Sequence, residues 1–248
     1  MKDESGNLVK SEEMIKELAI KTFQKRLENR PMNNELNDIK ESKEKLAMKL
    51  MELAKNNKTP PWTKTHLEKV LRQLKKNKSR DPLGLANEIF KPKVAGEDLK
   101  NGVLTLMNRI KDEQTYPKAM ELCNVSPIWK QKGPRNKFSS YRDIFRVTIL
   151  RSILDKLIYN DEYQKLDKSL TDCNVGGRKF RNIRDNIFAL NAILNSAKNK
   201  RGESHDLQIF DVETCFDALW LHEVISCLYE AGLKNEKLPL LFLENVNA

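Results

Sequence analysis

The sequence has little of what marks secreted, membrane or zinc-binding proteins. It has 4 cysteines in 248 residues, and none of them (Cys123, Cys173, Cys215 and Cys227) belongs to a CxxC pair, which argues against a disulfide scaffold or a zinc cluster. No apolar run approaches the roughly 18 residues that a membrane helix needs, and residues 1–7 lack the apolar core of a signal peptide. We therefore expect an intracellular protein of the cytoplasm or nucleus, neither secreted nor held in a membrane.

Positive charge is abundant, and it is concentrated in the middle of the chain. The 45 Lys and Arg residues outnumber the 35 Asp and Glu residues, which gives a formal net charge of +10. Residues 61–200 carry +14, whereas residues 1–60 carry +2 and residues 201–248 carry −6. A basic body followed by a carboxylate-rich segment suits an enzyme that acts on a polyanion, because cationic side chains hold phosphates and carboxylates hold divalent cations. A solvated surface of uneven charge is the alternative, and charge alone does not decide between them.

Hydrophobic spacing predicts an α+β, helix-rich fold. Apolar residues at helical spacing, with caps and breaks at the ends, predict helices over residues 11–30, 33–56, 64–80, 99–110, 150–159, 185–197 and 218–231. Alternating segments predict a hairpin of strands 124–130 and 144–147 around a basic loop, and one later strand over 207–212. We divide the chain into a helical N-terminal extension (1–58), a middle region (59–205) and a final strand–helix region (206–248).

The most informative segment is Phe-Asp-Val-Glu-Thr-Cys-Phe-Asp at 210–217. Asp211 follows an apolar strand, where a carboxylate leaves the core and meets solvent or metal, although a simple turn residue would fit the same place. Asp217 lies where the next helix begins, and we interpret it as a helix cap. A weaker hypothesis pairs Asp211 with Glu213 on one strand face as a nuclease-like site, but no third ligand is apparent.

The pattern Asp-x-x-x-x-Phe-Asp at 211–217 resembles the first palm motif of reverse transcriptases, more specifically those of LINE-type (non-LTR) retrotransposons. Three earlier segments resemble motifs of that family in the family's order: the turn at 78–85, the fingers hairpin at 126–144 and the glycine-containing segment at 174–187. The resemblance covers residues 62–248. It departs from the family pattern at Asp143, where proline is usual, and in the displaced glycine of the turn. Arg178 and Lys179 also replace an aromatic–basic pair.

The resemblance implies a partial right-hand polymerase, with a fingers-like subdomain over 59–205 and the first strand–helix unit of a palm over 206–248. It implies an RNA-directed DNA polymerase that uses an RNA template, a DNA primer, dNTPs and Mg²⁺. Asp211 would be the catalytic carboxylate on the metal ions, and the carbonyl of Val212 would be a further metal ligand.

The resemblance also implies roles for side chains outside the metal site. Lys130 or Lys132, together with Arg142, would contact the triphosphate, and Phe216 would lie under the incoming sugar. An ordinary loop lysine and a core phenylalanine are the alternatives for Lys132 and Phe216. Nucleic acid would contact the most basic segments of the chain: Lys75, Lys76, Lys78, Arg80, Arg178 and Lys179.

The match lacks one part of the family's catalytic site. The family needs two adjacent aspartates on a later hairpin, and this sequence contains no Asp-Asp pair. We therefore expect a truncated polymerase that is inactive alone, with the remaining palm and the thumb missing. The alternative is a non-catalytic, basic nucleic-acid-binding or scaffold fragment.

Overall fold

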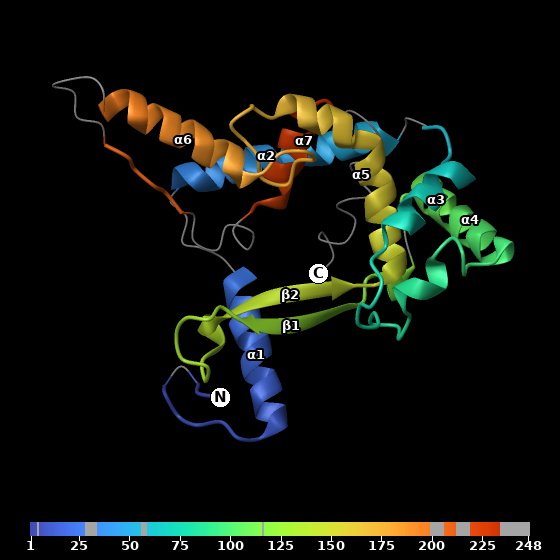
Figure 1. The fold of residues 1–248 in the computed structure, drawn as a ribbon. Helices are drawn as coiled ribbons and strands as arrows, with labels where there is room; N and C mark the ends of the chain where they lie inside the picture. The colour runs from blue at the N-terminus through green and yellow to red at the C-terminus, as the bar shows by residue number, and fades with distance from the viewer. Residues whose placement is uncertain are drawn as a thin grey trace.

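The computed structural model describes residues 1–3, 5–27, 34–55, 59–115, 117–198, 206–211 and 219–233. Within these ranges the fold is α+β and helix-rich, as predicted, with one small two-stranded sheet. The helices are α1 (Glu12–Leu27), α2 (Asn34–Lys55), α3 (Lys64–Gln73), α4 (Glu97–Glu113), α5 (Ile149–Ser169), α6 (Ile183–Lys198) and α7 (Leu221–Glu230), with 3₁₀ turns η1 (Asn87–Phe90), η2 (Lys118–Met120) and η3 (Phe138–Ser140). The strands are β1 (Cys123–Trp129) and β2 (Tyr141–Val147) (Figure 1). None of the described helices combines the length and the apolar character needed to cross a membrane.

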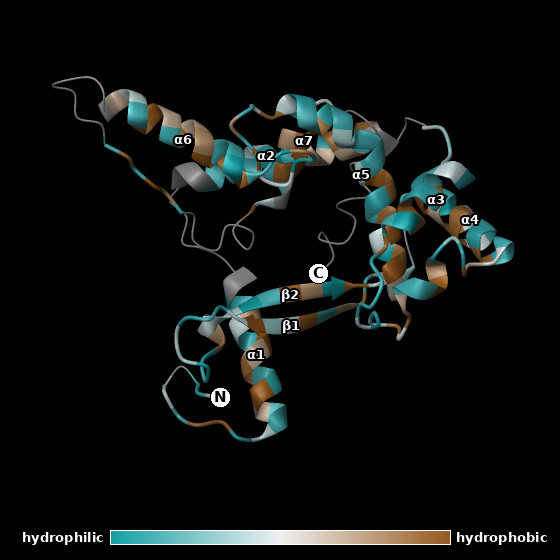
Figure 2. Ribbon diagram, in the orientation of Figure 1, coloured by the Kyte–Doolittle hydropathy of each residue, from teal (hydrophilic) through white to brown (hydrophobic). Residues whose placement is uncertain are grey.

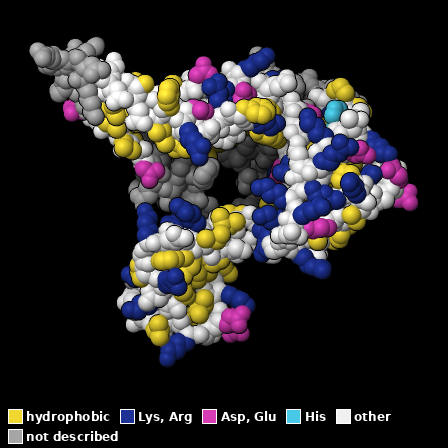
Figure 3. All heavy atoms as spheres, in the orientation of Figure 1, with side chains coloured by type: hydrophobic (Ala, Val, Ile, Leu, Met, Phe, Trp, Pro, Cys, Tyr) yellow, Lys and Arg dark blue, Asp and Glu magenta, His cyan; other side chains and the backbone are white. Residues whose placement is uncertain are grey.

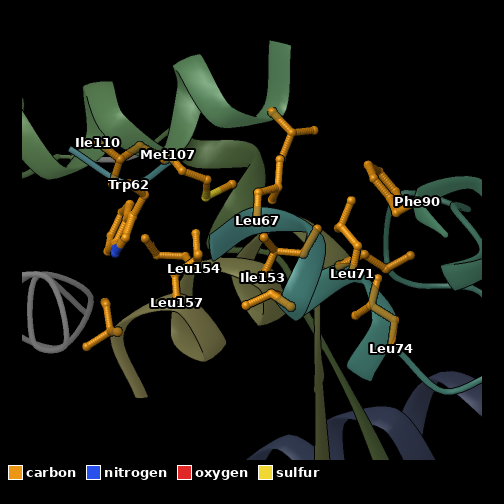
Figure 4. Packing of buried hydrophobic residues seen from close by; sticks show 14 of the residues in the cluster. Trp62, Leu67, Leu71, Leu74, Phe90, Met107, Ile110, Ile153, Leu154 and Leu157 are labelled. Atoms are coloured by element: carbon orange, nitrogen blue, oxygen red, sulfur yellow. The ribbon is translucent and has the colours of Figure 1, made fainter. Parts of the chain in front are cut away.

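The main hydrophobic core lies between α3, α4 and α5 (Figure 4). Leu67, Met107 and Ile153 are fully buried there, and burial of side chains of this size stabilises the fold by roughly 1.5–3 kcal/mol each. The predicted cap of α3 is confirmed, because the Thr63 hydroxyl accepts a hydrogen bond from the backbone N–H of His66. The Nδ1 atom of His66 accepts in return from the N–H of Thr63 at 3.2 Å, which completes a capping box.

The two strands form an antiparallel hairpin that projects from the base of this core (Figure 1). Trp129 pairs with Tyr141 at the tip, and Cys123 pairs with Val147 at the base. The second strand is therefore three residues longer than the predicted 144–147. The first helix lies against the tip, where the Phe23 and Phe138 rings meet edge to face at 5.8 Å.

A second, smaller core joins two helices that are far apart in the sequence. Ala47 and Leu50 of α2 pack with Ile225 and Leu233, in and just after α7. The N-terminal helices thus contact both later regions, α1 at the hairpin and α2 at α7. The predicted domain boundaries at residues 58 and 205 stay predictions.

The predicted strand over 207–212 is wrong for its described part, since residues 206–211 form no strand. Ile209 and Phe210 are each 85% exposed, and no described segment pairs with them. An extended segment without a partner has no hydrogen-bond ladder, so alternation alone does not make it a strand. Figure 2 shows apolar residues along α6 as well, where Phe188 and Ile193 are exposed outside both cores.

Candidate nucleic-acid interface

The hairpin carries the three cationic residues predicted to contact a triphosphate. Lys132 lies in the loop and Arg142 on β2, and both side chains are exposed. The Nζ of Lys130 instead donates to the carbonyl oxygen of Ser139 at 3.1 Å, within the same loop. Two of the three cationic groups therefore face solvent, while the third helps to fix the loop.

The loop conformation that presents Lys132 depends on a glycine and on an aromatic contact. Gly133 has a φ of +77°, and a Cβ there would come within 2.6 Å of the Ser140 hydroxyl, so a larger residue strains the turn. The Arg135 guanidinium lies over the Trp129 ring, 4.4 Å from its centroid. That contact adds a further cation to the tip of the hairpin.

One face of the hairpin mixes arginine with exposed apolar side chains. Opposite residues of an antiparallel pair share a face, and the register pairs Arg142 with Ile128 and Ile144 with Ser126. Arg146 follows at the next position of β2 on this face. Ile128 and Ile144 are 53% and 45% exposed, which leaves both the guanidinium of Arg142 and apolar surface accessible.

The predicted turn at 78–85 packs directly on the base of the hairpin. The Nη1 of Arg146 donates to the Ser79 hydroxyl at 2.6 Å. Asp81 is 8% exposed, and its Oδ2 accepts from the N–H of Ile149, the first residue of α5, at 3.0 Å. Its Oδ1 accepts from the N–H groups of Leu83 at 2.9 Å and Leu85 at 2.8 Å. These hydrogen bonds hold the turn against β2 and against α5, the helix that follows β2.

Asp81 and Arg146 were not among the predicted site residues. The Asp-Pro-x-Gly pattern indicates a turn in which the aspartate bonds to following N–H groups, so a signal for Asp81 was present. Arg146 carried no such signal, since its partner lies 67 residues away in the chain.

The basic run at 75–80 was predicted to end the third helix, but α3 ends at Gln73 and the run forms a loop beside this junction. All four of its cationic side chains are exposed: Lys75, Lys76, Lys78 and Arg80. The loop has a fixed shape, because Asn77 adopts a φ of +56° and its N–H donates to the Glu88 carboxylate at 2.6 Å. This hydrogen bond, with nearby lysines, holds the pKa of Glu88 below its ordinary value. Figure 3 shows Lys and Arg side chains gathered where α5 meets the base of the hairpin.

The side chain of Arg178, in the loop that contains Gly176 and Gly177, pairs with other residues of the protein. Its side chain is 7% exposed and pairs with Asp167 at 2.9 Å, and it also donates to the carbonyl oxygens of Asp167, Thr171 and Asn174. The hydrogen bond from Arg178 holds the pKa of Asp167 below its ordinary value, despite the opposing effect of desolvation. Arg178 therefore fastens the loop to α5, and its contact with nucleic acid stays a prediction.

Lys179, the neighbour of Arg178, is exposed and lies over an aromatic ring. Its Nζ is 4.2 Å from the centroid of the Tyr163 ring, and its backbone N–H donates to the Tyr163 hydroxyl at 2.8 Å. The predicted nucleic-acid contact of Lys179 also stays a prediction, with the ammonium group free to reach solvent on one side.

The predicted metal site is described only at Asp211, whose side chain is exposed. Val212 and Phe216 lie outside the described residues. Among the residues that the structure does describe, no three His, Cys, Asp or Glu side chains come together as metal ligands. A lone exposed carboxylate suits Mg²⁺ by its chemistry but does not make a site, so the metal role of Asp211 stays a prediction.

No protein-family model matches the chain, and no curated protein matches it.

Proposed function

We propose that this chain is the fingers-containing part of a LINE-type RNA-directed DNA polymerase, and that it holds primer–template and dNTP through its basic hairpin and the basic run at 75–80. The observation that carries the proposal is the junction between two motifs recognised separately in the sequence. Ser79 lies 67 residues before Arg146 and Asp81 lies 68 residues before Ile149, yet Ser79 contacts Arg146 on β2 and Asp81 contacts Ile149 at the start of α5. Motifs that share one site are expected to meet in space, which supports reading them as parts of one polymerase subdomain.

The exposed cations of the hairpin and of the basic run suit phosphate binding. Arg142 presents a planar fork of donors, which matches phosphate oxygens better than the point charge of a lysine. Lys132 adds a mobile cation at the loop. The nearby basic run would hold the nucleic-acid backbone without reading its bases, because contacts to phosphates carry no sequence information.

The chemical step needs groups beyond the hairpin. Bound Mg²⁺ would activate the attacking 3′-hydroxyl and stabilise the charge on the transferred phosphate. Asp211 is the residue of this chain proposed to hold it, with the carbonyl of Val212. No Asp-Asp pair exists in the sequence to complete the site.

A second candidate function is non-catalytic binding of nucleic acid by the basic surface alone. It is favoured by the same missing Asp-Asp pair and by the scattered carboxylates of the described residues. Both candidates predict binding, and only the first predicts that polymerase activity appears when the missing carboxylates are supplied.

Salt-dependent binding tests what the two candidates share. Fluorescence anisotropy of a labelled RNA–DNA primer–template should give a log Kd that rises linearly with log salt. The double variant Lys76→Gln/Lys78→Gln, in the run proposed to hold the nucleic-acid backbone, should weaken binding and reduce the slope by about 1.4–1.8, the value expected for two lost phosphate contacts. The matched control is Lys45→Gln/Lys49→Gln, which removes two exposed charges from α2. Equal slopes for the two double variants, or binding indifferent to salt, would contradict the proposal.

A further inference from the structure

An open cleft lies at the base of the hairpin, where four separate segments meet. It has a volume of about 390 Å³, and its polar lining consists of Ser79, Ser126, Arg146 and Ser152. Ser79 comes from the turn after α3, Ser126 and Arg146 from the two strands, and Ser152 from the start of α5. The rest of the lining is apolar surface of β2, and none of the described residues brings a carboxylate side chain into the cleft.

The polar groups of this cleft are arranged as donors. Arg146 donates to the Ser79 hydroxyl at 2.6 Å and to the Ser126 hydroxyl at 3.5 Å. Because each hydroxyl accepts from the arginine, its own hydrogen is left to donate to something else. The Nε–H of Arg146 is buried and has no hydrogen-bond partner among the described residues, although buried N–H groups are nearly always paired.

The surrounding charge favours an anion in the cleft. Ser152 belongs to the first turns of α5, where the helix dipole is positive. Asp81, the carboxylate at the same junction, has both oxygens engaged by backbone N–H groups. Lys78 and Arg80 flank Ser79 and are exposed. A group that only accepts hydrogen bonds and carries negative charge matches this set of donors.

We propose that this cleft binds one phosphate of a nucleic-acid backbone. The neighbouring groups favour a nucleic-acid strand over a free anion. The basic run lies on one side of the cleft, and Arg142 lies on the other, four residues before Arg146 on the same strand face. That spacing corresponds to about 13 Å along a strand. A strand that contacts both the run and Arg142 passes over the cleft and places a phosphate at Arg146.

This inference rests on the proposed function and adds a specific phosphate site to it. If Arg146 were only an internal brace between the turn and the hairpin, the serine hydroxyls would have no partner beyond the protein. A carboxylate placed in the cleft at Ser152 separates the two cases, because it repels a phosphate and leaves the side chains of Arg146, Ser79 and Ser126 in place.

The test compares Ser152→Asp with Ser42→Asp, which adds the same charge to an exposed position of α2. An acidic residue near the start of α5 favours the helix, so Ser152→Asp should fold. With a labelled oligothymidylate, we expect Ser152→Asp to bind about tenfold more weakly than Ser42→Asp, as for one lost charge-assisted hydrogen bond. The salt slope should fall by about 0.7, the value for one contact with a single strand. Equal affinity and slope for the two variants would overturn the inference.

The side-chain Nε–H signal of Arg146 in a ¹⁵N-resolved NMR spectrum provides a direct readout. It should shift on addition of the oligothymidylate and shift less with inorganic phosphate at the same phosphate concentration. A shift with inorganic phosphate that equals or exceeds the shift with the oligothymidylate would overturn the assignment to nucleic acid. No shift with either probe would overturn the site.

The variants also separate this site from the proposed function. If Lys76→Gln/Lys78→Gln weakens binding but Ser152→Asp behaves like Ser42→Asp, the cleft is excluded and the basic run remains. If Lys76→Gln/Lys78→Gln has no effect either, both proposals fail.

Discussion

Removal of the Asp81 carboxylate should destabilise the junction between the turn and α5 far more than removal of a carboxylate from a turn usually does. Asp81 is 8% exposed, and it accepts three backbone hydrogen bonds. Its bond from Ile149 is buried and spans 68 residues of chain, so it fixes the turn against the first residue of α5. Asp81→Asn keeps one acceptor oxygen for Leu83 and Leu85 but replaces the other with an NH₂ group that cannot accept from Ile149.

The expected magnitude follows from these contacts. A hydrogen bond to a charged group contributes about 1.5–3 kcal/mol, so Asp81→Asn should lower the free energy of unfolding by about that amount. Asp81→Ala leaves all three N–H groups without their acceptor and should cost about 3–5 kcal/mol, less than a simple sum because the contacts share one carboxylate. Either loss is a large part of the 5–15 kcal/mol typical of a folded domain.

Urea unfolding followed by circular dichroism measures this effect. The control is Asp112→Ala, which removes an exposed carboxylate from α4 and should change stability by less than about 0.5 kcal/mol. The urea m-value should stay constant, since the same surface unfolds. Hydrogen exchange of the Ile149 amide should accelerate in both Asp81 variants. If Asp81→Asn is as stable as Asp112→Ala, the buried bond to Ile149 does not stabilise the junction and the reasoning fails.

Two further predictions concern catalysis and acid stability. The isolated chain should not extend a primer in the presence of Mg²⁺, because it has no Asp-Asp pair; dNTP incorporation that is lost in Asp211→Ala would refute this. Because Arg178 holds the pKa of Asp167 below its ordinary value, the pair should stabilise the fold above the ordinary aspartate pKa, and this contribution should be lost as the pH falls through the lowered pKa. Asp167→Asn should therefore make unfolding stability less dependent on pH in the acid range, and an unchanged pH profile would contradict the pairing.

Helices with clear apolar spacing and a local cap could be predicted from the sequence. Thr63 marked the start of α3, and helix α4 exceeded its predicted range by only a few residues at each end. Helix α5 was predicted to end at 159 but continues to Ser169. Its second half is polar and is supported by pairs one turn apart, including Tyr159 with Tyr163 and Lys165 with Glu162. Such pairs stabilise a helix without an apolar stripe, so hydrophobic spacing did not reveal it.

Strand prediction failed where pairing had to be known. The early part of β2 was missed because Arg142 and Asp143 interrupt its alternation, and it forms by pairing with Ile128 and Pro127. Residues 207–211 alternate well but have no partner among the described residues. The candidate site shows the same limit of local patterns. The exposed cations of the hairpin were found from local motifs, whereas the contact of Arg146 with Ser79 depends on long-range packing.

The contacts at both ends of the hairpin explain how a two-stranded sheet can position its cations. An isolated hairpin is marginally stable in water, and this one exposes apolar side chains on both faces, including Phe145 and Ile144. At its base Arg146 and the Asp81 turn fix it to α5. At its tip the N-terminal segment holds the loop, where the Lys2 N–H donates to the Asn136 carbonyl at 2.7 Å. Because the hairpin is anchored at both ends, Arg142 stays at a set distance from the cleft. A fixed spacing between cations lets a surface match successive phosphates, which a surface that only carries positive charge does not do.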